Sequence, residues 1–122
     1  MSTRSLWVPE RAEIILIDFS PHVGKEMPDV HAMLVFSVKA FADRTGIVAG
    51  FPMTHAASNA DNPFVLTTKD QHGAASYVLA YQPKSFDWRA RNGRPHAMGT
   101  GHTKLLSEAL VLFNEIFSTA ET

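Results

Sequence analysis

Two apolar runs separated by a polar stretch dominate the first third of the chain. Ile14–Phe19 is apolar apart from Asp18, and Ala32–Val38 is the second run. The β-branched residues of the first run and the proline that follows it favour a buried strand over a helix. The eleven residues between the runs, 20–30, are predicted to form a charged loop. Loops of this length inside a compact domain are commonly functional.

Shorter apolar runs predict further strands, and turn-forming residues separate them. The expected strands are Ile47–Met53, Pro63–Thr67, Ser76–Tyr81 and the short, polar Lys84–Arg89. Gly50 inside the first of these predicts a bulge or a close approach of two backbones. The segments expected to be polar turns or loops are Lys39–Gly46, Thr54–Asn62, Thr68–Gly73 and Arg91–Gly101.

Only the C-terminal segment has a helical period. Apolar residues recur at spacings of three and four from Leu105 to Phe117, and Thr103 is a suitable N-cap. Short strands, turns and one terminal helix predict a mainly β fold with a C-terminal α-helix, in the form of a small antiparallel β-barrel. A length of 122 residues predicts a single domain spanning residues 1–122.

The composition excludes several classes of function. A net charge of −1 gives no bulk attraction to nucleic acid or to a membrane surface. The absence of cysteine excludes disulfides and thiolate metal sites and fits a reducing cytoplasm. No signal peptide is visible, and no apolar run approaches the ~18 residues of a membrane helix. The six histidines lack metal-ligand spacing, so we expect neither a metal site nor a cofactor.

A local basic cluster with interleaved aromatic rings stands out in this nearly neutral chain. Its members are Lys84, Phe86, Trp88, Arg89, Arg91 and Arg94. Cations follow a phosphate backbone, and rings stack on bases. Strand alternation places Phe86 and Trp88 on one face. We favour a core or dimer-interface role for these two rings, which leaves the cations as candidate contacts to nucleic acid.

Four stretches together resemble one family. The opening Trp7–Pro21, the turn Gly24-Lys25-Glu26, the strand end Phe51-Pro52-Met53-Thr54 and the segment Gln82–Arg91, which ends in Trp-Arg-Ala-Arg, are similar to MazF/PemK-type toxins of toxin–antitoxin pairs. The resemblance covers the chain from about Trp7 to Phe117. The order and spacing of these motifs carry it.

The resemblance implies a fold, an activity and partners. It implies an SH3-like barrel that forms a homodimer and cleaves single-stranded RNA in the cytoplasm without a metal. It also implies an antitoxin whose acidic tail lies across the RNA groove. One position departs from the family pattern, because His31-Ala32 stands where an arginine and a proline are usual. Leu79 and Tyr81 stand where some relatives carry an arginine and an aspartate.

Metal-free cleavage of RNA requires the 2′-OH to attack the adjacent phosphorus, which leaves a 2′,3′-cyclic phosphate. The reaction needs a base, an acid and a cation for the phosphorane. His31 can serve as acid, as base or as a weaker cation. The other interpretation makes it a partly exposed imidazole in a decayed toxin that only binds RNA or antitoxin.

The resemblance and the residue types indicate further candidate site residues. Thr54 is expected to hydrogen-bond a phosphate oxygen or the 2′-OH. Glu26 is a candidate base or orienting acid, and Lys25 a candidate phosphate contact. His55 is a candidate second proton donor or RNA contact. The predicted contacts to the RNA backbone are Lys84, Arg89 and Arg91, and contact with the antitoxin is another interpretation of the two arginines. For each of these residues an ordinary surface or strand-end role is the alternative interpretation.

Overall fold

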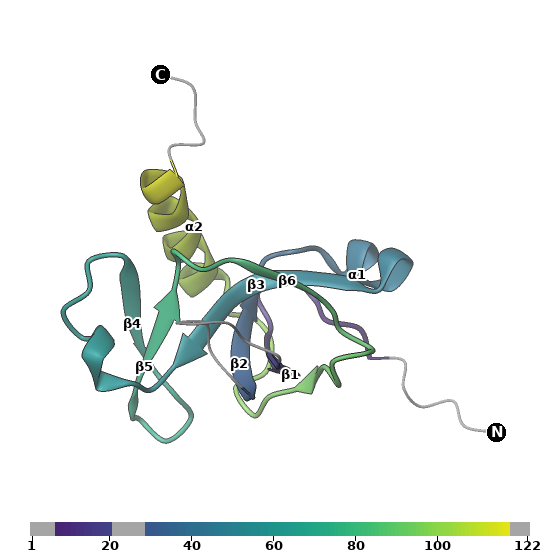
Figure 1. The fold of residues 1–122 in the computed structure, drawn as a ribbon, viewed down its shortest axis with the longest axis horizontal. Helices are drawn as coiled ribbons and strands as arrows, with labels where there is room; N and C mark the ends of the chain where they lie inside the picture. Colours follow the sequence, from purple (N-terminus) through teal and green to yellow (C-terminus); the bar gives the residue numbers. More distant parts are fainter. Residues whose placement is uncertain (1–6, 21–28, 118–122) are drawn as a thin grey trace.

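The computed structural model describes residues 7–20 and 29–117. Figure 1 shows the fold and labels its main elements. The strands are β1 Ile14–Asp18, β2 Val30–Val35, β3 Ile47–Thr54, β4 Val65–Lys69, β5 Ala75–Leu79, β6 Lys84–Asp87 and β7 Arg94–Pro95. The helices are α1 Lys39–Thr45, the short 3-10 helix Ala57–Asn59 and α2 Thr103–Phe117.

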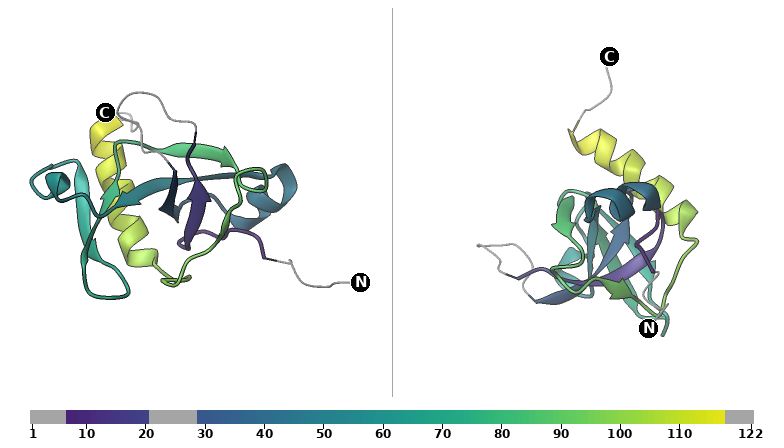
Figure 2. Two further views of the ribbon diagram at one scale, coloured as in Figure 1. Left: turned by 60° about the horizontal axis from the view of Figure 1, so that its bottom comes forward. Right: turned by 90° about the vertical axis from the view of Figure 1, so that its right-hand side faces the viewer.

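The strands form one antiparallel sheet. Its order is β4-β5-β3-β2-β1-β7, and β6 pairs with β3 beside this path. Within the described residues β4 and β7 do not pair, so hydrogen bonds do not close the barrel. Figures 1 and 2 show α2 against the sheet, with its C-terminal end extending beyond the strands. The predicted mainly β fold with a C-terminal helix is confirmed.

Strand β1 separates two apolar clusters because both of its faces are buried. Ile14 packs into the cluster that includes Phe51 and the helix residue Leu106. Ile15 and Ile17 pack on the other side, in the cluster that includes Trp88. Burial of both faces explains why this strand reads as a continuous apolar run. Three further side chains pack against the second cluster: Trp7, Val8 and Phe86, of which Phe86 was expected in the core or a dimer interface.

Gly50 allows strands β2 and β3 to approach closely. It pairs with Val35 in the antiparallel register. A Cβ atom at this position would lie 2.5 Å from the carbonyl oxygen of Leu34 and 2.6 Å from Cγ of Met33. The predicted close backbone approach is therefore confirmed, and a side chain here would disturb the pairing of the two strands.

The structure corrects two predictions about helices. The segment Lys39–Gly46, expected to be a polar turn, forms helix α1, which ends at Gly46 with a φ of 75°. The indole of Trp88 donates a hydrogen bond of 3.0 Å to the carbonyl of Ala42 in this helix. A tertiary contact therefore stabilises a helix that is too short to be stable alone. At the other end, Thr103 begins α2 rather than capping it.

Candidate active site

The sheet register brings His31 and Thr54 together. His31 pairs with Ile17 of β1, and Ala32 pairs with Met53 of β3. The pairing of β2 with β3 ends at Ala32 and Met53, and His31 and Thr54 are the next residues of the two strands. Opposite residues of neighbouring strands project to the same face, with Cβ atoms about 5 Å apart. Two candidates that lie far apart in the sequence thus fall at the same end of two neighbouring strands.

An aromatic contact holds the His31 side chain. The imidazole is half-buried, and its centroid lies 6.0 Å from that of the Phe19 ring, with an angle of 89° between the planes. This edge-to-face arrangement is favourable for aromatic pairs. In the part of the chain that the structure describes, no group hydrogen-bonds the imidazole. Packing against Phe19 therefore orients the imidazole, and its two nitrogens can bind other partners.

Thr54 ends β3 with a hydroxyl that can still donate. Its Oγ1 accepts a 3.2 Å hydrogen bond from the backbone N–H of Ala56. A hydroxyl carries a donor as well as two lone pairs, so its proton remains available to an anionic oxygen. Since the side chain is only half-buried, a ligand on this face can reach it.

His55 is paired with the carboxylate of Asp70, a residue that no sequence motif indicated. Its Nε2 lies 2.8 Å from Oδ2 of Asp70. Backbone N–H groups of Ala74 and His72 donate to Oδ1 of the same carboxylate, and these hydrogen bonds lower the pKa of Asp70. The side chain of His55 is 63% exposed, whereas that of Asp70 is 11% exposed. The pair therefore presents an oriented imidazole to solvent immediately after Thr54.

His96 is the imidazole whose ionisation the fold changes most clearly. Burial lowers the pKa of His96, Asp70 opposes that shift, and His55 adds to it. The neutral ring accepts a 2.9 Å hydrogen bond at Nδ1 from the backbone N–H of Met98. This contact gives His96 a structural role in the connection between β7 and α2. Across residues 7–20 and 29–117, no three histidine or acidic side chains gather into a metal-binding group.

The basic cluster divides between two parts of the fold. The guanidinium of Arg89 lies 4.7 Å from the centroid of the Trp88 ring and donates 3.3 Å to the carbonyl of Asp43 in α1. The guanidinium of Arg91 lies 4.4 Å from the centroid of Phe86 and reaches the end of β1. The two cations thus serve different elements, although only one residue separates them.

Two other predicted site residues fall outside the part that the structure describes. Lys25 and Glu26 lie between residues 20 and 29, so their roles stay predictions. Lys84 begins β6 and is half-buried. It pairs in register with Gly50 of β3.

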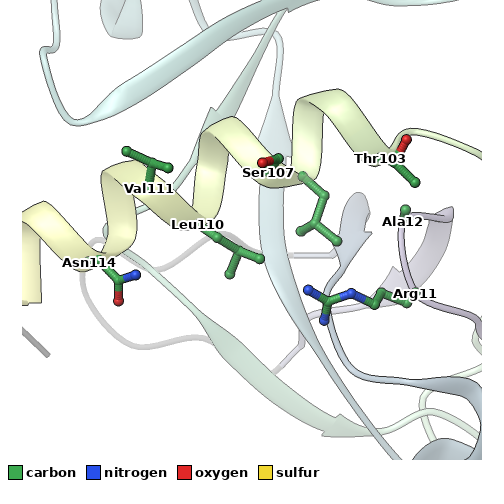
Figure 3. A pocket seen from close by; sticks show the side chains of 8 residues that line it. Arg11, Ala12, Thr103, Ser107, Leu110, Val111 and Asn114 are labelled. Atoms are coloured by element: carbon green, nitrogen blue, oxygen red, sulfur yellow. The ribbon is translucent and has the colours of Figure 1, made fainter. Parts of the chain in front are cut away.

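A groove runs along α2, and neither His31 nor Thr54 lines it. It encloses about 330 Å³. Figure 3 shows its lining, which consists of Arg11, Ala12, Thr103, Leu106, Ser107, Leu110, Val111 and Asn114. Arg11 donates a hydrogen bond to the carbonyl of Phe36, which holds its guanidinium beside the apolar floor. The groove is mainly apolar between polar ends.

The antiparallel sheet with its terminal helix is the fold of a class of toxin. The sequence model of the family described as PemK-like, MazF-like toxin of type II toxin-antitoxin system matches residues 10–117. The chain belongs to that family.

Individual relatives agree with this assignment. The chain is 32% identical over 87 residues to the endoribonuclease toxin MazF of Escherichia coli (strain K12), covering 71% of this chain and 76% of that protein. The crystal structure of MazF (Form-I) from Deinococcus radiodurans superimposes with a TM-score of 0.81 at 26% identity, covering 93% of this chain and 99% of that one. A MazE-MazF crystal structure (Form-II) from the same organism shares the fold, with a TM-score of 0.73 at 23% identity and the same coverage. None of the described helices is both long and apolar enough to cross a membrane.

Proposed function

We propose that this chain is the toxin of a toxin–antitoxin pair and cleaves single-stranded RNA without a metal ion. The observation that supports the proposal is the β2–β3 pairing, which ends at Ala32 and Met53 and leaves His31 and Thr54 as the next residues at the same end of two neighbouring strands. Membership of the toxin family and 32% identity to a protein named an endoribonuclease support it. The reaction is attack of the 2′-OH on the adjacent phosphorus, with loss of the 5′-oxygen and formation of a 2′,3′-cyclic phosphate.

The roles of the residues follow from their chemistry. Thr54 donates a hydrogen bond from its hydroxyl to a phosphate oxygen. His31 transfers a proton or, when protonated, stabilises the phosphorane as a cation. Glu26 is the candidate base and Lys25 a candidate phosphate contact, and both lie outside the described residues. The side chains proposed to contact the flanking RNA are His55, Lys84 and Arg89. Arg91 was also predicted to contact RNA, but its guanidinium donates to backbone carbonyls of Asp18 and Ser20 within the protein.

Incubation of the purified protein with a long unstructured RNA in EDTA tests this proposal. We expect fragments to appear at the same rate with and without the chelator. Mass spectrometry of the fragments should show 2′,3′-cyclic phosphate at their 3′ ends. Intact RNA after long incubation at high protein concentration would contradict the proposal, as would cleavage that the chelator abolishes.

A second candidate function is a catalytically decayed module that binds RNA or antitoxin. His31 favours it, because this residue replaces the arginine that the family pattern carries at this position. The module would bind RNA without turnover. Fluorescence anisotropy with a labelled oligonucleotide, followed by gel analysis of the same sample, separates the two candidates. Binding that weakens with salt, together with full-length RNA on the gel, would establish the module.

We also propose that the chain acts as a homodimer through α2. Val111 and Phe117 are 59% and 46% exposed, although both are large apolar side chains. Val111 borders the apolar groove beside Leu110 and Arg11. Exposed apolar side chains beside an apolar groove are typical of interaction sites in soluble proteins. The helix of a second copy is the proposed occupant, and its own exposed apolar residues would be buried in exchange.

Introduction of a charge at position 111 tests the dimer. Val111→Glu is expected to increase the fraction of monomer, because the carboxylate would lose its hydration in an apolar interface. The matched control is Val38→Glu, since Val38 is 52% exposed but precedes α1. Sedimentation velocity over a concentration series measures both variants. A wild-type chain that is monomeric throughout, or equal dissociation by both variants, would overturn the assignment of this surface.

The proposed inhibitor is an antitoxin with an acidic tail. One crystal structure from Deinococcus radiodurans is described as MazE-MazF, and this chain shares its fold. Such a tail would compete with RNA for the His31–Thr54 face, and the pair would act in the cytoplasm. The measurement is RNA cleavage in the presence of the purified product of any short acidic reading frame beside this gene. Unchanged cleavage at saturating concentration would refute that product as the antitoxin.

A further inference from the structure

Arg91 ties the end of strand β1 to the segment after β6. Its Nη1 donates to two backbone carbonyls, at 3.2 Å to Asp18 and at 2.6 Å to Ser20. The backbone N–H of Asp18 in turn donates 3.0 Å to the carbonyl of Arg91. One amino group has two N–H bonds, so both of its protons are used within the protein. These contacts join residues that lie more than seventy positions apart.

A continuous row of stacked groups leads from the same guanidinium to His31. Arg91 lies 4.4 Å from the centroid of Phe86. The rings of Phe86 and Phe19 are 5.0 Å apart at 79°, and those of Phe19 and His31 are 6.0 Å apart at 89°. Both ring pairs have the edge-to-face geometry and the spacing that aromatic pairs prefer. Because Phe19 is only 3% exposed, a shift of its ring would be passed on to its neighbours.

The start of strand β2 is fixed to the same place. The backbone N–H of Phe19 donates 2.8 Å to the carbonyl of Asp29, and that of Asp29 donates 3.2 Å to Oγ of Ser20. Asp29 has a φ of 62°, a conformation that non-glycine residues rarely adopt and that these hydrogen bonds hold. Arg91 therefore braces the junction from which β2 begins, two residues before His31.

We propose that Arg91 is a positioning residue for His31 and acts through Phe86 and Phe19. Its consequence for catalysis rests on the proposed ribonuclease function. The guanidinium donates both Nη1 protons to backbone carbonyls and stacks one face on the Phe86 ring. These contacts fix the side chain, whereas a phosphate contact at the surface would be mobile. Arg89, which stacks on Trp88 and contacts α1, has no corresponding link to His31 among the described residues.

The first measurement concerns the protein without RNA. The variant is Arg91→Ala, and Arg89→Ala is its matched control, since both remove a stacked arginine that donates to backbone carbonyls. We expect Arg91→Ala to move and broaden the imidazole resonances of His31 in ¹H–¹³C NMR spectra, because the ring current of Phe19 depends on the mutual orientation of the two rings. Arg89→Ala should leave those resonances in place.

The second measurement concerns cleavage. Arg91→Ala should lower kcat about 10- to 100-fold with little change in KM, because displacement of a catalytic group by about 1 Å has effects of this size. Arg91→Lys should recover part of the loss, because an ammonium donates to the same carbonyls but lacks the flat guanidinium face. Arg89→Ala should change KM more than kcat if it contacts RNA.

Several outcomes would overturn the proposal. Unchanged His31 resonances in Arg91→Ala, together with weaker RNA binding and a smaller salt dependence, would make Arg91 a phosphate contact. If Arg91→Ala does not fold, Phe19→Leu interrupts the same row while it keeps an apolar side chain. It should move the His31 resonances, and unchanged resonances would overturn the proposal. The NMR result also separates the two claims, because it is obtained whether or not the wild-type chain cleaves RNA.

Discussion

Alanine at position 31 is expected to lower the rate of RNA cleavage about 100- to 10,000-fold, the usual contribution of a positioned acid or base. His31 pairs with Ile17 at the end of β2 that lies next to Met53 and Thr54 of β3, and alanine removes both proton transfer and the positive charge of the protonated ring. The measurement is the single-turnover rate on a fluorescent oligonucleotide, with the Kd of the same oligonucleotide determined in parallel. Because His31 is half-buried at a strand entry, the fold should survive.

His55→Ala is the matched control for this prediction. His55 is an imidazole next to Thr54, but its Nε2 is engaged by Asp70, so its loss should lower the rate less than about tenfold. An alanine variant at position 31 that cleaves within about threefold of the wild type would refute the assignment. His31→Arg then distinguishes the roles. Faster cleavage would identify His31 as a weak cation, whereas loss of cleavage would identify proton transfer.

The strands with strong patterns could be predicted from the sequence. β1 reads as an apolar run because Ile14 and Ile15 face two different clusters, and both are fully buried. β3 was predicted within one residue, and Gly50 correctly indicated a close approach of backbones. The periodicity of α2 is equally clear because one side of it packs on the sheet, as Leu106 does. In each case burial of a long element decides the local structure.

The features that the sequence did not reveal depend on tertiary contacts. Helix α1 has one buried residue, Ala42, so its sequence shows no amphipathic pattern. It also has no side-chain cap that could mark its start. The pairing of His55 with Asp70 joins residues fifteen positions apart, with the 3-10 helix and β4 between them. The bonds from Arg91 to backbone carbonyls have no sequence signature, since any residue supplies a carbonyl. The family pattern indicated His31 as a candidate catalytic residue. Its pairing with Ile17 and its contact with Phe19 are visible only in the structure.

Replacement of Phe51 by alanine is expected to reduce the free energy of unfolding by about 3–5 kcal/mol, the range for large-to-small changes in a packed core. Phe51 is fully buried, and its ring lies 4.9 Å from that of Phe36 and 5.9 Å from that of Phe113 in α2. Alanine would leave a cavity between the sheet and the helix that their backbones cannot close. The measurement is urea unfolding at one fixed protein concentration, because association also stabilises a dimer.

Phe64→Ala is the control for that variant, since it removes the same ring from a side chain that is 50% exposed. Its cost should be below about 1 kcal/mol, as for most surface substitutions. Equal losses from the two variants would show that burial between sheet and helix does not set the stability. If the predicted difference is found, α2 is held to the sheet largely through Phe51 and Phe113. Phe51 pairs with Leu34 in the β2–β3 register that aligns His31 with Thr54, so the same core supports both the fold and the candidate site.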